Sequence, residues 1–387
     1  MTPFAFLRLF VPRLAVVVGA LALLEWAFRL GVWEPLVRPE SNAGQSVQLK
    51  MAVNALGADK LDFITLGDSR AVYGIEHQRV ADAATSAGFR HVNLSLAGTH
   101  WLTIDALLEW ITVRNRNLKG VLIATNVNSF TFEGNGSYEL AMAAPFMASW
   151  NSERMNRSVA FNRADVSTYG VYSALFLARE DVQDLITHPR ARLREIRAYA
   201  GRGSAPLTFS VKVAGDSCAI AHSSMAECAA ATPATDTERS IVSQCKSELP
   251  ASTQRADWRK WTTPGAMPHL EQLALSRQAE LRAMPLPKPL LVVLMPVPAL
   301  RRDELTPQGL EEFTKAALKP LVDDGTIVLY DFTHFFDKTP GGECVAFWDL
   351  YHQNTVGQAR LTDALLPTVQ HELYNRAGKA GTPPAAR

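Results

Sequence analysis

The sequence predicts an α/β fold in which a parallel sheet is flanked by helices. Short apolar runs that end at turn residues alternate with longer segments that have helical character. This alternation stops near residue 129 and resumes near residue 287. The chain has 387 residues, of which 47% are hydrophobic, so it can bury a sizeable core. Because strands that alternate with helices pair in parallel, we expect one sheet covered on both faces, with right-handed crossovers.

The expected elements follow from these runs. Five short apolar segments are predicted as strands: 61–66, 91–96, 121–124, 289–295 and 326–330. Four longer segments are predicted as helices: 75–87, 101–113, 307–321 and 355–374.

The N-terminal segment, residues 1–34, is predicted to be a membrane anchor. Leu14 to Leu24 carries no charge, and the apolar run reaches the roughly 20 residues needed to cross a bilayer if it tolerates Glu25 and Arg29. These two residues are four apart, a spacing that allows them to pair on a helix. A cleaved signal peptide and a buried helix are the alternatives. The apolar run continues past any plausible cleavage site, which favours an uncleaved transmembrane helix.

The rest of the chain divides by composition. The predicted parts are a polar, proline-containing linker (35–58), an α/β domain in two pieces (59–129 and 287–376), a large insertion serving as cap and loop (130–286), and a disordered tail (377–387). Three tryptophans in the insertion, Trp150, Trp258 and Trp261, offer faces for stacking on sugars, although most tryptophans of this chain are expected in the core.

The four cysteines are Cys218, Cys228, Cys245 and Cys344. No pair has the C-x-x-C spacing of zinc or thioredoxin-type sites. Their even number suits disulfides in an oxidising compartment, and three pairings are possible, among which the sequence does not choose. Free cysteines are the alternative.

Charge and motifs exclude several functions. The formal charge is +1, from 39 basic and 38 acidic residues, so no strong field attracts nucleic acid. The sequence has no zinc-protease, EF-hand, Walker or dinucleotide motif, so we expect no metal and no cofactor.

Two polar motifs lie at positions where α/β enzymes commonly carry catalytic residues. Ser69 follows the first predicted strand in LGDSRAVYGI, at the carboxyl end where such sheets bind ligands. Asp349 and His352 are three residues apart in DLYH, just before the last predicted helix. A serine nucleophile needs an imidazole as general base and a carboxylate that orients it. Each motif alone is common: Gly-Asp-Ser forms ordinary turns, and Asp349 suits a helix N-cap.

Taken together, these motifs resemble the SGNH (GDSL-type) hydrolase superfamily. Gly67-Asp68-Ser69 matches the first block of that family, and Asp349-Leu350-Tyr351-His352 matches the last. The resemblance covers about 60–130 and 287–375. It implies a three-layer SGNH-type fold with Ser69, Asp349 and His352 as catalytic triad. It also implies that the Gly98 backbone N–H and the Asn126 side chain hold the oxyanion.

The third block departs from the family pattern. The family has Gly-x-Asn-Asp, whereas this chain has Ala124-Thr125-Asn126-Val127-Asn128, so Asn128 is an alternative oxyanion donor. Arg70, directly after the nucleophile, either holds a charged or sugar-bearing substrate or pairs with a surface acid. The histidines His77, His100 and His334, and Asp105, are expected to be structural or surface residues.

An anchor and a large insertion on such a domain resemble the bacterial membrane-tethered SGNH proteins of alginate O-acetylation and teichoic-acid D-alanylation. The resemblance implies a single-pass protein of the bacterial inner membrane with its catalytic domain in the periplasm. Its partners would be an acyl donor, a polysaccharide acceptor and a multispanning membrane-bound O-acyltransferase. Ser69 would then carry an acyl group, which the resemblance implies is acetyl, to a glycan hydroxyl. The alternatives are a cell-envelope carboxylesterase or deacetylase with the same triad, and an inactive glycan-binding scaffold.

Overall fold

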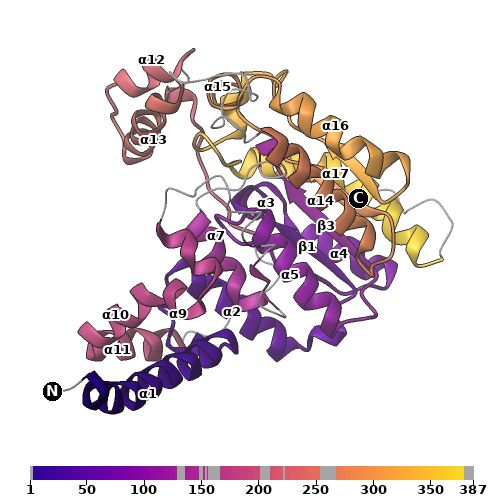
Figure 1. The fold of residues 1–387 in the computed structure, drawn as a ribbon. Helices are drawn as coiled ribbons and strands as arrows, with labels where there is room; N and C mark the ends of the chain where they lie inside the picture. The colour runs from indigo at the N-terminus through magenta and orange to yellow at the C-terminus, as the bar shows by residue number, and fades with distance from the viewer. Residues whose placement is uncertain are drawn as a thin grey trace.

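A computed structural model describes residues 3–128, 136–147, 151–152, 155, 166–200, 210–220, 223–252 and 267–378. Within these ranges the chain forms a five-stranded sheet with the order β2-β1-β3-β4-β5, and every strand pair is parallel. The strands are β1 (Phe63–Gly67), β2 (His91–Asn93), β3 (Gly120–Thr125), β4 (Leu290–Leu294) and β5 (Ile327–Asp331). The predicted α/β class with a parallel sheet flanked by helices is confirmed (Figure 1).

The sheet is buried on both faces because its three middle strands are apolar except for Thr65 and Thr125. Every residue of β1, β3 and β4 is buried. Successive side chains point to opposite faces, so Ile64 packs in one core cluster and its neighbour Phe63 in another. Strand β2 is shorter than the predicted run. The chain nevertheless continues beside β1, since the N–H groups of Leu94 and Leu96 donate to the carbonyls of Thr65 and Gly67.

Helices cover the two faces. The first core cluster joins one face to α5 (Trp101–Arg114), α14 (Met267–Ala283) and α16 (Leu310–Asp323). The second joins the other face to α3 (Ser69–Gly74), α4 (His77–Ala87) and α17 (Thr355–Arg376). The two stretches separated by the predicted insertion therefore meet in one sheet, in which β3 pairs with β4.

The predicted linker contains a packed helix, α2 (Asn42–Leu56). Its N-cap is Ser41, whose hydroxyl accepts a hydrogen bond from the Gly44 N–H. Leu49 and Val53 bury their side chains in the first core cluster. Helix α7 (Gly136–Ala143), from the predicted insertion, packs against α2 and α5.

The other described helices lie outside the two layers around the sheet. The α-helices are α1 (Pro3–Arg29), α9 (Ala174–Leu177), α10 (Arg179–Thr187), α11 (Pro189–Ala200), α12 (Met225–Ala230), α13 (Asp236–Ser252) and α15 (Ala299–Leu305). The 3₁₀ turns are Glu34–Leu36, Ala58–Lys60, Ala144–Phe146, Val166–Val171, Cys218–Ile220 and Glu343–Ala346. Residues 379–387 of the predicted tail, and Trp150, Trp258 and Trp261, lie outside the described residues.

Helix α1 is the one helix in the described part of the chain that is long and apolar enough to cross a membrane, over Phe10–Arg29. From Phe10 to Leu24 its apolar side chains are exposed. Glu25 pairs with Arg29 at 2.6 Å. The Glu25 carboxylate also accepts hydrogen bonds from the Ser173 hydroxyl and from the N–H groups of Ala174 and Leu175. The end of α1 is thus bonded to the start of α9, and the two lie side by side in Figure 1.

Helices α12 and α13 form a small separate unit, which projects from the sheet at the top left of Figure 1. The Cys228–Cys245 disulfide joins the two helices, and both cysteines are buried. The core of this unit includes Leu350 and is packed by Leu300, Leu305 and Tyr351. The unit therefore rests on the loop that precedes α17 and on α15.

Candidate active site

Ser69 is the first residue of α3, directly after the carboxyl end of β1. Asp68 is the N-cap of α3, and its carboxylate accepts a hydrogen bond from the Arg70 N–H at 2.8 Å. At Gly67 the backbone passes very close to β3. A Cβ there would lie 2.5 Å from the Ala124 carbonyl oxygen, so only glycine allows this approach. These contacts fix the turn that presents Ser69.

Three of the residues that the sequence singled out, Ser69, Asp349 and His352, are joined by hydrogen bonds in a series beyond the carboxyl end of β1. His352 Nδ1 lies 2.8 Å from Asp349 Oδ2, and His352 Nε2 lies 2.8 Å from Ser69 Oγ. A carboxylate oxygen accepts and cannot donate, so Nδ1 carries the proton and Nε2 is the acceptor that faces the serine hydroxyl. This is the tautomer in which an imidazole can remove a proton from a serine nucleophile.

Asp349 is buried and held by several donors. Its Oδ1 accepts the N–H groups of Tyr351 at 2.8 Å and of His352 at 2.7 Å. Its Oδ2 accepts the His352 imidazole and the Gln244 side-chain amide. Burial by itself raises the pKa of Asp349, but the hydrogen bonds and the charge of His352 hold that pKa below its ordinary value. Asp349 is therefore an anion at neutral pH.

Aromatic rings fix the plane of His352. The Trp348 ring stacks on it, with 5.7 Å between centroids and an angle of 16°, and the Tyr73 ring of α3 lies 4.7 Å away. The backbone N–H of Trp348 donates to the His352 carbonyl at 3.1 Å. The imidazole is therefore oriented by packing as well as by Asp349.

Gly98 lies in the loop after β2, with a φ of +77°. A Cβ at this position would collide with the hydroxyl of Tyr138 on α7, so the site requires glycine for both conformation and space. The neighbouring Thr99 hydroxyl donates to the Gly67 carbonyl at 2.8 Å. This bond ties the Gly98 loop to the end of β1, beside the Ser69 turn.

Asn126 is buried directly after β3. Its side-chain amide donates to Asp68 Oδ2 at 3.1 Å, and its Oδ1 accepts the Asn128 N–H at 2.9 Å. Of the two asparagines that the sequence offered, Asn126 is thus the one bonded to the nucleophile turn. The bond to Asp68 places the Asn126 side chain beside Ser69.

Asp68 connects the serine turn to Asn126 and Arg70, a role that the sequence did not reveal. Besides capping α3, it accepts from Asn126 and pairs with the Arg70 guanidinium at 3.1 Å. Arg70 is buried, so its partner is this internal acid and not a surface one. Burial lowers the pKa of Arg70, and the charge of Asp68 partly opposes that shift. The arrangement locks the ends of β1 and β3 together around Ser69.

The other histidines have different environments. His77 and His91 are buried and stacked, and the His77 Nε2–H donates to the Ala71 carbonyl at 3.0 Å. His334 is exposed and lies between Asp337 and Glu311. His100 is the N-cap residue of α5, near Asp68 and Arg70, and burial lowers its pKa. None of these histidines bonds to Ser69 in the described residues.

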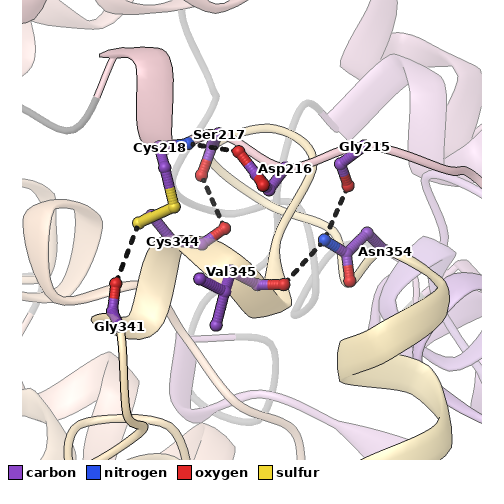
Figure 2. Close-up of a disulfide and its surroundings, with 8 residues drawn as sticks. All are labelled: Gly215, Asp216, Ser217, Cys218, Gly341, Cys344, Val345 and Asn354. Carbon is purple, nitrogen blue, oxygen red and sulfur yellow. Dashed lines mark hydrogen bonds between the residues drawn. A yellow bond between two sulfur atoms is a disulfide. The ribbon is translucent and has the colours of Figure 1, made fainter.

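The loop that carries Asp349 is tied to the chain segment before α12 (Figure 2). The Cys218–Cys344 disulfide joins the two segments, and the Ser217 N–H donates to the Phe347 carbonyl at 2.8 Å. On the other side of the loop, the Asn354 amide bridges the carbonyls of Gly215 at 2.7 Å and Val345 at 2.9 Å. The four cysteines thus form two disulfides, Cys218–Cys344 and Cys228–Cys245, which is one of the three possible pairings.

The geometry of the site suits a serine nucleophile. Ser69 can attack an acyl carbonyl, His352 can hold its proton, and Asp349 can stabilise the resulting imidazolium. No group of three or more His, Cys, Asp or Glu side chains in the described ranges is placed to hold a metal ion.

No model of a known protein family matches the chain, and no curated protein matches it. What the chain does must therefore be inferred from the geometry of its own residues, chiefly Ser69, His352 and Asp349.

Proposed function

We propose that the chain is a membrane-anchored, extracytoplasmic SGNH-type serine O-acyltransferase that carries an acyl group, most simply acetyl, to a cell-envelope or exported polysaccharide through an acyl-Ser69 intermediate. The observation that carries this proposal is the hydrogen-bonded series from Asp349 through His352 to Ser69, with 2.8 Å at each step. Such a series activates a serine for attack on an ester or thioester carbonyl.

The arrangement of the loops supports the SGNH resemblance. Strands β2, β1 and β3 are neighbours, so the carboxyl ends that carry Gly98, Ser69 and Asn126 lie along one edge of the sheet. The serine turn lies between the two loops that the family uses for the oxyanion. The Asn126–Asp68 hydrogen bond joins the loop after β3 to the serine turn. The Thr99–Gly67 hydrogen bond joins the loop after β2 to the end of β1.

The reaction has two halves. In the first, Ser69 Oγ attacks the donor carbonyl as His352 Nε2 takes its proton, and the imidazolium then protonates the departing group, which leaves acyl-Ser69. In the second, His352 takes the proton of an acceptor hydroxyl, whose oxygen attacks the acyl carbon. The C–O bond to Ser69 breaks, and His352 returns the proton to Oγ. The Gly98 N–H and the Asn126 amide are the proposed donors to the oxyanion of both halves.

The setting supports work outside the cytoplasm at a membrane. Helix α1 is long and apolar enough to cross a bilayer, and both disulfides suit an oxidising compartment. By the resemblance, a multispanning membrane-bound O-acyltransferase supplies the acyl group across the membrane. No cofactor is needed for either half of the reaction.

The experiment uses the full chain in detergent with p-nitrophenyl acetate as donor. A panel of neutral and uronic-acid oligosaccharides serves as acceptor, and acetylated product is detected by mass spectrometry. We expect turnover and acetylated oligosaccharide from the wild type and neither from Ser69→Ala. Ser86→Ala is the matched control, because Ser86 is exposed on α4 away from the site. Turnover that persists in Ser69→Ala contradicts the proposal. Ser69-dependent release of acetate without acceptor modification replaces it with the carboxylesterase or deacetylase alternative.

A further inference from the structure

We propose that Gln244 of α13 is a positioning residue of the triad, which holds the Asp349 carboxylate and the following peptide group in the orientation that His352 requires. The inference rests on the proposed serine chemistry. It assigns a role in that chemistry to the disulfide-linked unit of α12 and α13, which lies outside the sheet.

Gln244 uses both ends of its side-chain amide on the Asp-x-x-His turn. Its Nε2 donates to Asp349 Oδ2 at 3.3 Å, and its Oε1 accepts the Leu350 N–H at 3.3 Å. Oδ2 is the same oxygen that accepts the Nδ1 proton of His352. Because donor and acceptor are both engaged, the amide can make these two bonds in only one of its two orientations.

The helix that carries Gln244 is fixed on the same turn at other points. The next residue, Cys245, is buried and bonded to Cys228. Four residues further along the same helix face, Glu248 accepts the Tyr351 hydroxyl and lies 3.5 Å from Arg301. The Arg301 guanidinium lies 4.0 Å from the centre of the Tyr351 ring. Leu350 completes the contact by packing into the core of α12 and α13.

The consequence concerns rotation of the carboxylate. The backbone N–H groups of Tyr351 and His352 both bind Oδ1, so within the described residues Oδ2 is oriented by His352 and Gln244. His352 must release and take up protons during the reaction, whereas the neutral amide donates throughout. Gln244 therefore keeps Oδ2 in place while the charge on the imidazole changes, which bears on kcat and not on substrate binding.

Charged and titratable groups surround the Asp349–His352 pair from several elements. They are Tyr73 and Arg70 of α3, Tyr351 of the turn itself, Glu248 of α13 and Arg301 of α15. A test that reads pH dependence must leave these groups unchanged and alter only position 244.

The test compares Gln244→Met and Gln244→Lys with the same two substitutions at Ser243, an exposed neighbour on α13. Methionine keeps the length of the side chain and removes both hydrogen bonds. Lysine keeps a donor and adds a positive charge beside Asp349. Each full-length variant is assayed in detergent with p-nitrophenyl acetate across pH, and its fold is checked by circular dichroism.

We expect Gln244→Met to lower kcat by roughly 3- to 30-fold with KM unchanged within about twofold. We expect Gln244→Lys to move the acid limb of the pH–rate profile to lower pH by about 0.5 to 1 unit, because an added cation disfavours the imidazolium. The Ser243 variants should match the wild type in both respects. A Gln244→Met kcat within twofold of wild type, or equal shifts at positions 243 and 244, overturns the assignment.

A second readout does not require turnover. In a Ser69→Ala background, the titration of His352 is followed by NMR of histidine-labelled protein. Its midpoint should move to lower pH with Gln244→Lys and stay in place with Ser243→Lys. If the wild type has no Ser69-dependent activity while this shift appears, the proposed function fails and the positioning role stands. If activity depends on Ser69 and no shift appears, only the positioning role fails.

Discussion

The two halves of the candidate triad are held by different kinds of structure. Ser69 follows β1, which is wholly buried between two neighbouring strands, and its turn is stabilised by a backbone ladder and by the Asp68 contacts. Asp349 and His352 lie in a loop that is held from outside the sheet by the Cys218–Cys344 disulfide and by Gln244. The nucleophile therefore depends on the main core, whereas the acid–base pair depends in addition on cross-links to residues 210–252.

Because the two halves are held differently, we expect that the acid–base pair can be displaced while the sheet stays folded. The serine turn unfolds only with the sheet, since the strands on both sides of β1 are in the central core. The Asp-x-x-His turn packs through Leu350 into a much smaller core, that of α12 and α13, and the preceding Ala346 and Phe347 are buried in the second core cluster. We therefore expect perturbations of the two regions to have separable effects, and four predictions test the separation.

The largest effect is expected from the disulfide that ties down the loop. Cys218→Ser with Cys344→Ser opens a link between residues 126 positions apart, whereas Cys228→Ser with Cys245→Ser opens one of 17 positions. By loop entropy the losses in unfolding free energy are about 5 and about 3 kcal/mol. Urea denaturation followed by circular dichroism measures both. Equal losses, or a greater loss for the shorter link, would show that loop entropy does not set their contributions.

The next effect is expected on the nucleophile side. Asn126→Ala should lower kcat by about 10²- to 10³-fold, because it removes the proposed oxyanion donor that is bonded to Asp68. Asn128→Ala, two residues further on, is the matched control and should retain kcat within a few-fold. Steady-state kinetics on p-nitrophenyl acetate separates the two. A reversed order would identify Asn128 as the donor.

The free energy of unfolding is expected to depend on pH through two buried histidines of the main fold, His77 on α4 and His91 on β2. Burial lowers the pKa of His77 to about 4, and it lowers the pKa of His91 in the same direction. The unfolded chain binds a proton near pH 6.5 that folded His77 does not accept until about pH 4, so stability falls as the pH drops through this window. For His77 the loss amounts to about 2 kcal/mol at pH 5.

The measurement compares unfolding free energies at pH 7 and pH 5 for the wild type and for His77→Gln. The variant should lose about 2 kcal/mol less than the wild type over this interval, whatever its absolute stability. An identical pH dependence in both chains would mean that His77 titrates normally in the folded protein.

The smallest effect is expected at His334, which lies on the surface after β5. Partial burial opposes its charge, but hydrogen bonds to Asp337 and Glu311 raise its pKa above the ordinary value. Its stabilisation is therefore present below about pH 6.5 and is lost as the pH rises through the raised pKa. Because the side chain is 49% exposed, His334→Gln should cost less than about 1 kcal/mol at pH 6 and less still at pH 9. Thermal denaturation at the two pH values measures this, and a loss that grows with pH contradicts the sign.

Local patterns in the sequence were sufficient for the sheet and for the two motifs that meet in it. Strands such as 61–66 and 289–295 are apolar runs between turns, and the five predicted strands correspond to β1 to β5. Ser69 and the Asp349–His352 pair were recognisable because each is a short motif at a strand or helix end. Their roles remain proposals, although the structure brings them within hydrogen-bonding distance.

Other features were not predicted from the sequence. The polar composition of 35–58 predicted a linker, whereas α2 forms there and buries only part of one face; its Ser41 N-cap was the usable signal. The disulfide pairing depends on distances across the fold, which residue spacing does not encode. Gln244 is one half-buried polar residue on an amphipathic helix, and its contact with Asp349 spans 105 positions of sequence. Asp68 sits in a tripeptide that forms ordinary turns, so its contacts with Arg70 and Asn126 were not foreseen.

The central claim is that Ser69 forms an acyl intermediate with the help of His352. The most direct measurement is peptide mass spectrometry of the full chain after brief exposure to p-nitrophenyl acetate, for the wild type, His352→Ala and the surface control His334→Ala. We predict an acetyl group on Ser69 in the wild type and in the control, formed at least about 10³-fold more slowly in His352→Ala. An acetyl group found elsewhere, or formed on Ser69 at the same rate without His352, would contradict the account.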